Sequence, residues 1–272
     1  MTEELKRKYQ LLCEDLQTMG SVAVAFSAGV DSTLLLKIAH DVLKERAIAV
    51  TVCSCFVPKR EQAEAERLCK GMDIRLIRLE ADTLSIPGVR ENNEDRCYLC
   101  KHELFSRIKE TAEQNGFSWV AEGSNVDDTS DYRPGMRAIR ELGVQSPLLK
   151  AGLTKDEIRV LSKEFGLPTW DKPAMACLAT RFPCGTALKE EDLRRVEHAE
   201  TKLIELGFQQ LRVRSHGELA RIELSADDQA RVMQPEMKQA VSQELHTLGY
   251  RWVTLDMDGY RRGSTNLQPE GK

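Results

Sequence analysis

The chain has 272 residues, of which 41% are hydrophobic and 30% charged, and its formal net charge is −4. This composition is typical of a soluble globular protein, and it excludes a membrane-spanning helix because no run approaches roughly 18 apolar residues. The acidic balance disfavours a protein that mainly binds nucleic acid, since such proteins are usually basic. The first residues, MTEELKRKYQLL, are amphipathic and unlike a signal peptide, so we expect a cytoplasmic protein with no membrane partner.

Helix and strand patterns alternate from the amino terminus onward. In the first helix, Leu5, Leu11, Leu12 and Leu16 are expected on one side. The expected helices are 2–18, 31–44, 59–71, 100–115 and 154–166, and the expected strands are 21–26, 47–53, 74–79 and 118–122. Strands that alternate with helices predict an α/β fold with a parallel sheet.

The pattern changes after a segment rich in proline. Residues 167–186 contain Pro168, Pro173 and Pro183 and are the expected linker region. A helix over 189–206, strands over 210–216 and 219–224, a helix over 226–248 and a strand over 252–256 follow. This order predicts a small α+β domain. We therefore expect a first domain over 1–180, a second over 186–263 and a disordered tail over 264–272.

The motif Ser27-Ala28-Gly29-Val30-Asp31-Ser32 lies between a predicted buried strand and a predicted helix. Backbone N–H groups converge at such a place, and the helix dipole favours an anion. Ser27 and Ser32 can donate hydroxyl hydrogen bonds to a phosphate, whereas Asp31 would act on one through Mg²⁺. The motif lacks the Gly-Lys-Ser/Thr element of a Walker loop. A tight turn capped by serine or aspartate remains an alternative interpretation.

Eight cysteines suggest thiol or metal chemistry rather than a disulfide framework, because no export signal precedes them. They are Cys13, Cys53, Cys55, Cys69, Cys97, Cys100, Cys177 and Cys184. Cys97 and Cys100 form a C-x-x-C motif at the start of a predicted helix, which is compatible with metal ligands, a redox dithiol or two buried small side chains. The first four lie on predicted helices or strands, where core packing is the expected role.

The phosphate motif resembles the signature Ser-Gly-Gly-x-Asp-Ser of the PP-loop ATP pyrophosphatases, with Ala28 in place of the first glycine. Since alanine disfavours positive φ, we expect a negative φ at Ala28. The resemblance implies that the loop grips ATP and that pyrophosphate is released, leaving AMP on the substrate. The residues expected to bind ATP and Mg²⁺ are Ala25, Ser27, Gly29, Asp31 and Ser32 at the phosphates and Ser54 and Gly123 near adenine.

Further motifs narrow the resemblance to the LarE family of ATP-dependent sulfur transferases. These are Ala121–Asp128 (AEGSNVDD), Asp131–Gly135 (DYRPG), Arg181–Thr186 (RFPCGT) and Leu211–Ser215 (LRVRS), and the likeness runs over about residues 18–262. The resemblance implies adenylation of a carboxylate on a pyridinium dicarboxylate mononucleotide. Sulfur then displaces AMP to give a thiocarboxylate for a nickel-pincer cofactor. It also implies a small-molecule nucleotide substrate and a homo-oligomer.

Two sulfur routes occur in this family. A member can sacrifice its own cysteine, or three cysteines can hold a [4Fe-4S] cluster whose open iron carries a sulfide. The resemblance favours Cys97, Cys100 and Cys177 as the cluster ligands, with Cys177 also expected to be catalytic. Cys177 lies one position after the place of the sacrificial cysteine, which favours the cluster, and sacrifice of Cys177 is the alternative. Zinc held with Cys184 as a fourth ligand is another.

Four arginines are expected to bind the substrate phosphate or carboxylate, and they are Arg133, Arg181, Arg212 and Arg214. Arg212 and Arg214 alternate on a predicted strand and so share one face. A solvated strand face, or an ion pair of Arg133 or Arg181 with Asp128 or Asp131, is the alternative.

Glu200 and Glu223 match acidic positions of a metal site in the family, but the third acid of that set falls on Arg231. A cation there disfavours a metal, and the two glutamates are then ordinary surface charges.

Three other functions remain open at this stage. A tRNA thiolase would share the PP-loop and cluster but is disfavoured by the acidic balance. Amidation of the GMP or NAD synthetase kind would leave Cys97, Cys100 and Cys177 unexplained. A nucleotide-binding sensor would not release AMP.

Overall fold

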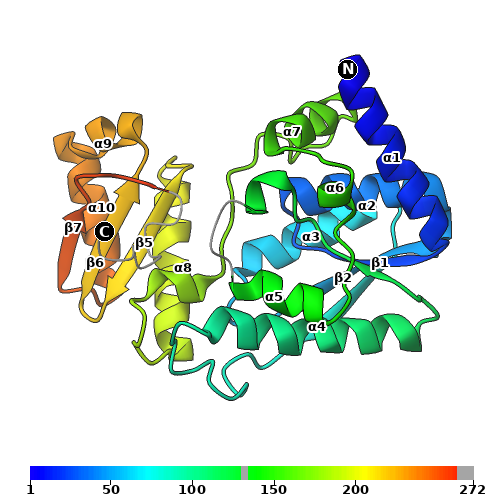
Figure 1. Cartoon of the computed structure of the whole chain (residues 1–272). Helices are drawn as coiled ribbons and strands as arrows, with labels where there is room; N and C mark the ends of the chain where they lie inside the picture. Colours follow the sequence, from blue (N-terminus) through cyan, green and yellow to red (C-terminus); the bar gives the residue numbers. More distant parts are fainter. Residues whose placement is uncertain (130–133, 262–272) are drawn as a thin grey trace, which may run out of the picture. The chain divides into compact units, whose positions relative to one another are not determined.

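The computed structural model describes residues 1–129 and 134–261, which form two compact units (Figure 1). The first comprises Met1–Ile86 and Asp95–Met175, and the second comprises Pro87–Glu94 together with the chain from Ala176 onward. The segment Pro87–Glu94 belongs with the later chain because its carbonyls accept backbone hydrogen bonds from it: Asn92 from Gly185 (2.9 Å) and Arg90 from Leu188 (2.7 Å). No feature of the sequence predicts that this segment packs with the later part of the chain.

The first unit contains a four-stranded, all-parallel sheet in the order β3-β2-β1-β4. The strands are β1 (Val22–Ala25), β2 (Ala47–Cys53), β3 (Leu76–Glu80) and β4 (Val120–Ala121). Strand β4 is shorter than predicted, and a parallel bridge from Ala121 to Gln145 extends the sheet beyond it. The predicted parallel α/β fold is confirmed.

Helices cover both faces of this sheet. They are α1 (Glu3–Met19), α2 (Val30–Leu43), α3 (Lys59–Gly71), α4 (Arg96–Gln114), α5 (Pro134–Glu141), α6 (Pro147–Lys150) and α7 (Lys155–Glu164). Short 3₁₀ segments lie at Lys44–Arg46 and Val126–Thr129. Helices α5 and α6 were not predicted, because both begin at a proline inside segments that lack a long apolar period.

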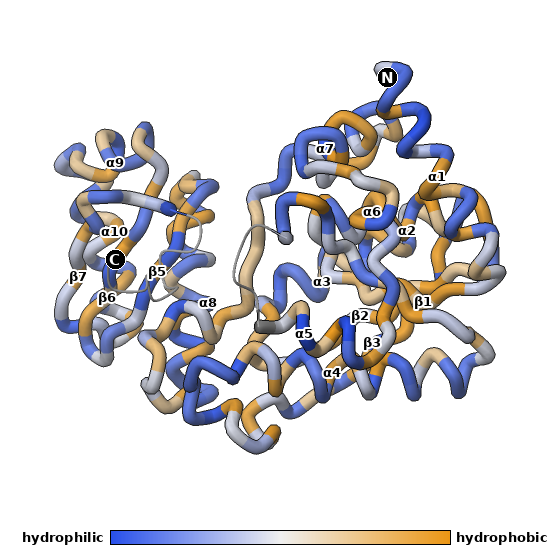
Figure 2. The backbone as a smooth tube through the Cα atoms, in the orientation of Figure 1, coloured by the Kyte–Doolittle hydropathy of each residue, from blue (hydrophilic) through white to orange (hydrophobic). Residues whose placement is uncertain are grey.

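Side chains alternate between two cores along the central strands. Val22 and Val24 pack with α1, α2 and α7, whereas Ala23 packs on the opposite face with α4 and α5. This alternation follows from the two-residue period of a strand, and Figure 2 shows the central strands as an apolar band in the backbone. Leu11 is 44% exposed, contrary to the prediction, because it lies about 100° around the helix from buried Leu12.

The second unit is a small α+β fold, as predicted. Its elements are a 3₁₀ turn (Leu178–Arg181), α8 (Glu190–Glu205), β5 (Leu211–His216), β6 (Leu219–Leu224), α9 (Ala226–Val232), α10 (Pro235–Thr247) and β7 (Trp252–Leu255). The sheet order is β5-β6-β7, with β5 antiparallel and β7 parallel to β6. The single helix predicted over 226–248 is wrong. Pro235 starts a new helix there, because its ring and missing N–H interrupt the first one.

Within the described ranges, no helix combines the length and apolarity that a membrane crossing needs. The predicted tail over 264–272 lies outside the described residues.

Candidate active site

The phosphate motif occupies the turn between β1 and α2, at the carboxyl end of the parallel sheet. Ala25 ends β1, Ser54 follows β2, and Gly123 follows β4, so the predicted nucleotide residues lie beyond the ends of three neighbouring strands. Ligands of open α/β sheets bind at this edge. A Cβ atom on Gly123 would lie 3.0 Å from the Ser32 nitrogen, so a side chain there would press on the backbone of the motif.

Hydroxyl groups link the two ends of the loop. The Ser27 N–H donates to Ser32 Oγ (3.3 Å), and the two hydroxyl oxygens lie 3.1 Å apart. Helix α2 begins after Gly29, and no described side chain caps it. The first-turn N–H groups of a helix have no partner within the helix, so they suit an anion.

The expectation of a negative φ at Ala28 is wrong. Ala28 has φ 55° and is fully buried. An L-residue in the left-handed region costs about 1–2 kcal/mol, so the surrounding contacts must hold it there. One such contact is the hydrogen bond that the Ala28 carbonyl accepts from Lys172 Nζ at 3.0 Å.

Asp31 projects from the first turn of α2 and is partly exposed, at 23% of its side chain. One carboxylate oxygen accepts from Asn125 Nδ2 (3.1 Å) and the other from Lys155 Nζ (2.5 Å). A carboxylate with this access is a ligand type that Mg²⁺ accepts. Lys155 and Asn125 were missed from the sequence, although Asn125 stands in the AEGSNVDD motif and Lys155 directly follows the capping-box residue Thr154.

The three predicted cluster ligands fall in different units. Cys97 and Cys100 lie three residues apart in the first turns of α4, in the first unit, and Cys177 precedes the 3₁₀ turn of the second. None of the eight cysteines, all of which lie in the described ranges, forms a disulfide. Within each unit, no group of three or more described His, Cys, Asp or Glu side chains could hold a metal ion.

Gly135, the last residue of the DYRPG motif, packs on the C-x-x-C helix. A Cβ atom there would lie 3.2 Å from Cys97 Sγ and 2.5 Å from Lys101 Cδ. Arg133, the predicted substrate residue of this motif, lies outside the described residues.

Arg181 and Glu200 form a fully buried ion pair, with side chains 0% and 1% exposed. Arg181 Nε and Nη2 donate to the two Glu200 oxygens at 2.8 and 3.1 Å. Arg181 Nη1 donates to the carbonyls of Ala176 (3.0 Å) and Cys177 (3.2 Å). Burial raises the pKa of Glu200, but the Arg181 charge more than reverses this, so the pKa is lowered overall. Asp131, an alternative partner of Arg181, lies outside the described residues.

Arg214 and Glu223 form a second buried pair. Arg214 Nε and Nη2 donate to Glu223 at 2.9 and 2.8 Å, and Nη1 donates to the Thr180 carbonyl at 2.8 Å. Arg212, two residues earlier on β5, is 6% exposed and stacks over the Tyr260 ring at 5.0 Å. Burial and the Arg181 charge lower the pKa of Arg212. Because both strand arginines are buried, the alternative of a solvated strand face is wrong.

The expectation that Glu200 and Glu223 are surface charges is wrong as well, since each is buried and paired with an arginine. Arg231, at the third position of the expected acidic set, donates to the carbonyls of Leu206 and Gly207 at the end of α8. It therefore serves as a helix C-cap.

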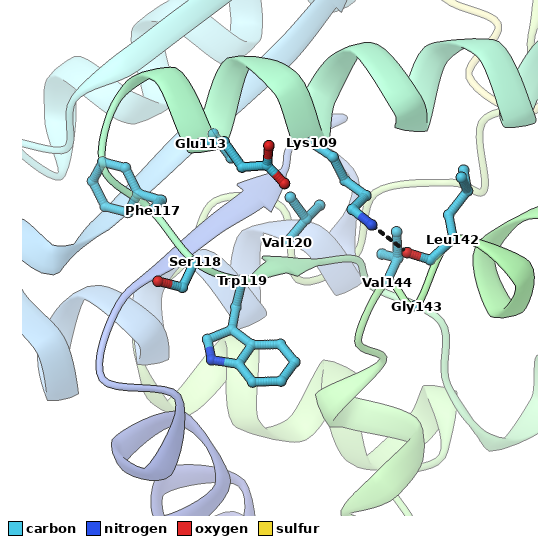
Figure 3. A pocket seen from close by; sticks show the side chains of 10 residues that line it. Lys109, Glu113, Phe117, Ser118, Trp119, Val120, Leu142, Gly143 and Val144 are labelled. Atoms are coloured by element: carbon cyan, nitrogen blue, oxygen red, sulfur yellow. Dashed lines mark hydrogen bonds between the residues drawn. The ribbon is translucent and has the colours of Figure 1, made fainter.

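A separate pocket of about 180 Å³ lies at the opposite edge of the first sheet (Figure 3). Trp119 and Val120 line it at the amino end of β4, and Lys109 donates to the Leu142 carbonyl across it at 2.7 Å. Its position, at the other end of the strand from Gly123, separates it from the phosphate loop.

Comparison with known proteins gives full-length relatives. No family model matches the chain. The chain is 37% identical, over 96% of its length and 95% of the relative's, to the pyridinium-3,5-bisthiocarboxylic acid mononucleotide synthase of Lactiplantibacillus plantarum. It is 38% identical, over 96% of the chain and 98% of the relative, to an uncharacterized protein of Synechocystis sp.. A glutamine-hydrolyzing GMP synthase of Helicobacter pylori is 28% identical over 54% of this chain and 32% of that protein.

Proposed function

This chain belongs to the LarE family of PP-loop proteins, and from that membership we propose that it is an ATP-dependent sulfur transferase. Its substrate is a pyridinium dicarboxylate mononucleotide, and its product is the corresponding thiocarboxylate, for a nickel-pincer cofactor. The observation that carries the proposal is the 37% identity to a synthase of that product class over almost the whole of both chains.

The first step is adenylation. A substrate carboxylate oxygen attacks the α-phosphorus of ATP, the bond to the β-phosphate oxygen breaks, and pyrophosphate leaves. Ser27, Gly29 and Ser32 are proposed to hold the departing phosphates through their N–H and hydroxyl groups. Asp31 is the proposed ligand of Mg²⁺, which neutralises charge on the phosphates when it is bound.

Lys155 and Gly123 are proposed to shape the nucleotide site around Asp31 and Ser32. Lys155 pairs with Asp31 at 2.5 Å and so fixes the position of this carboxylate beside the loop. Gly123, which approaches Ser32 closely, leaves space that a side chain would fill. Ser54 and Gly123 are proposed to face the adenine from the ends of β2 and β4, the two strands that flank β1.

The second step transfers sulfur. A sulfur nucleophile attacks the acyl carbon, and AMP leaves with the electrons of the acyl–oxygen bond. Acyl adenylates have a good leaving group, and thiolates are strong nucleophiles near neutral pH. Cys177, whose backbone carbonyl is held by Arg181, is the proposed cysteine at this step. If its own sulfur is the nucleophile, the thioester that forms must lose the Cα proton and break the Cβ–Sγ bond, which leaves dehydroalanine in the chain and the sulfur on the substrate as a thiocarboxylate.

The source of the sulfur remains a prediction from the family resemblance. No step of this proposal passes through a [4Fe-4S] cluster. Cys97 separates the routes: a cluster requires it, whereas sacrifice of Cys177 does not.

Substrate binding is proposed for the buried arginines of the second unit. Arg212 and Arg214 project from the same face of β5, and guanidinium groups suit phosphate. Arg212 is proposed to contact the phosphate, whereas Arg214, which is held by Glu223 and the Thr180 carbonyl, is proposed to orient this part of the site. Arg181, fully engaged with Glu200 and backbone carbonyls, is proposed to act by fixing the shape of the site. Arg133 stays a prediction. Self-association is also proposed, from the family alone.

The test is purified protein with Mg²⁺–ATP and the pyridinium dicarboxylate mononucleotide. AMP and pyrophosphate should form in equal amounts and only with this substrate. AMP release with tRNA, and none with the mononucleotide, would instead identify a tRNA thiolase.

A further inference from the structure

Lys172 reaches the phosphate loop from a position 144 residues farther along the chain. Its ammonium nitrogen lies 3.0 Å from the Ala28 carbonyl oxygen, 2.6 Å from Glu61 Oε2 and 2.5 Å from Glu64 Oε2. Its side chain is only 13% exposed. An ammonium group has three donors, and here each has an oxygen partner. Lys172 is therefore held in place rather than moving freely in solvent.

The backbone of Lys172 is also held. Its N–H donates to the Thr169 carbonyl at 3.0 Å, and its carbonyl accepts from Arg159 Nη2 of α7 at 3.0 Å. Both ends of the residue are thus fixed within the first unit. Its ammonium has a defined position relative to the loop.

The loop residue that Lys172 contacts, Ala28, is also the one with an unfavourable backbone conformation. Ala28 has φ 55°, where an alanine costs about 1–2 kcal/mol. The peptide that joins Ala28 to Gly29 is planar and trans, so its carbonyl and the Gly29 N–H point in opposite directions. A cation that holds the carbonyl on one side therefore fixes the direction of the Gly29 N–H on the other.

We propose that Lys172 is a positioning residue of the phosphate loop, which holds the Ala28 carbonyl and so keeps the Gly29 N–H directed at the nucleotide phosphates. Glu61 and Glu64 hold the ammonium in turn. This arrangement explains how the chain keeps an alanine where the PP-loop signature has glycine. The inference rests on the proposed function, since it requires that the loop bind ATP.

The test is a double-mutant cycle on nucleotide affinity. The dissociation constant of Mg²⁺–α,β-methylene-ATP is measured by calorimetry for the wild type, Lys172→Met, Ala28→Gly and the combination. With Ala28 present, Lys172→Met removes the hydrogen bond to the Ala28 carbonyl, and the loop can then rearrange and release about 1–2 kcal/mol of backbone strain. We therefore expect the nucleotide to bind about tenfold more weakly. In the Ala28→Gly background the left-handed backbone carries little strain, and the loss should fall to about threefold or less.

Two controls keep the result specific. Lys150→Met removes a lysine that pairs with Asp15 and is 66% exposed, and it should leave the affinity unchanged. If Lys172→Met fails to fold, Lys172→Met/Glu61→Gln removes the lysine together with the more buried of its two carboxylate partners, Glu61, and takes its place in the cycle.

If Lys172→Met lowers the nucleotide affinity equally with Ala28 and with Ala28→Gly, the positioning role is overturned. Such a result would indicate a direct effect of the lysine charge on the nucleotide. No loss in either background would overturn it as well. Failure of the wild type itself to bind the nucleotide would instead refute the proposed function, so the two failures are distinguishable.

Discussion

Replacement of Glu200 by Gln should strongly destabilise the second unit. Glutamine keeps the size of the side chain but removes its charge, and Arg181 is then left as an uncompensated cation at 0% exposure. Breaking a buried pair by removing one partner typically costs about 3–5 kcal/mol. Both oxygens of Glu200 bond to Arg181, and Oε1 also accepts from the Val213 N–H at 3.1 Å. We therefore expect Glu200→Gln to lose about 3–5 kcal/mol.

Urea unfolding followed by circular dichroism measures this change. A matched control lies on the same helix: Glu205 is 58% exposed and pairs with Lys202 at 3.0 Å. Glu205→Gln should change the free energy of unfolding by less than about 1 kcal/mol, because exposed ion pairs contribute little. The combination Arg181→Met/Glu200→Gln should cost less than the sum of its single changes, since neither charge is then left alone.

The pH dependence gives an independent check. The pKa of Glu200 is lowered from its ordinary value of 4.5 in the folded chain, because the effect of burial is outweighed by the Arg181 charge. A carboxyl with a lowered folded pKa contributes stability above its unfolded pKa, and this contribution is lost as the pH falls below about 4.5 through the folded value. The variant Glu200→Gln should lack this part of the acid dependence. If it is as stable as Glu205→Gln and keeps the wild-type acid profile, the reasoning on the buried pair is refuted.

Three further predictions concern the proposed active site. Gly123→Ala should lower stability by about 1–3 kcal/mol and reduce ATP-dependent AMP release, because its Cβ would lie 3.0 Å from the Ser32 nitrogen, whereas Gly71→Ala meets nothing within 4 Å and should be neutral in both assays. Asp31→Ala should reduce AMP release about a hundredfold or more with near-normal unfolding, and retained activity would contradict its proposed role. If a cluster supplies sulfur, anaerobically purified protein should contain about four iron atoms per chain and Cys97→Ala should abolish turnover. A single turnover by that variant, without iron, would instead support sacrifice of Cys177.

Local signals in the sequence predicted most elements and the turn between β1 and α2 that the Ser27–Ser32 motif occupies. Thr154 and Glu157 form the expected capping box at the start of α7, because a cap depends only on residues three apart. The loop after β1, Ser54 after β2 and Gly123 after β4 lie at the same edge of the sheet because parallel strands end there. The two-domain α/β and α+β architecture followed from the change of pattern near Pro183.

Contacts between distant segments could not be predicted. Lys155 meets Asp31 across 124 residues, and no local pattern encodes such a contact. The left-handed backbone of Ala28 opposes its own propensity, so it depends on tertiary contacts such as the one with Lys172. The buried pairing of Arg214 with Glu223 depends on the register of β5 and β6, which a single sequence does not specify.

The central claim is tested most directly by incubating the purified protein with Mg²⁺–ATP, a sulfide source and the pyridinium dicarboxylate mononucleotide, followed by mass spectrometry. The account predicts one AMP for each acyl group activated and a product in which sulfur has replaced a carboxylate oxygen, with both absent in Asp31→Ala. AMP formation that does not depend on the mononucleotide, or a product that carries no sulfur, would contradict it.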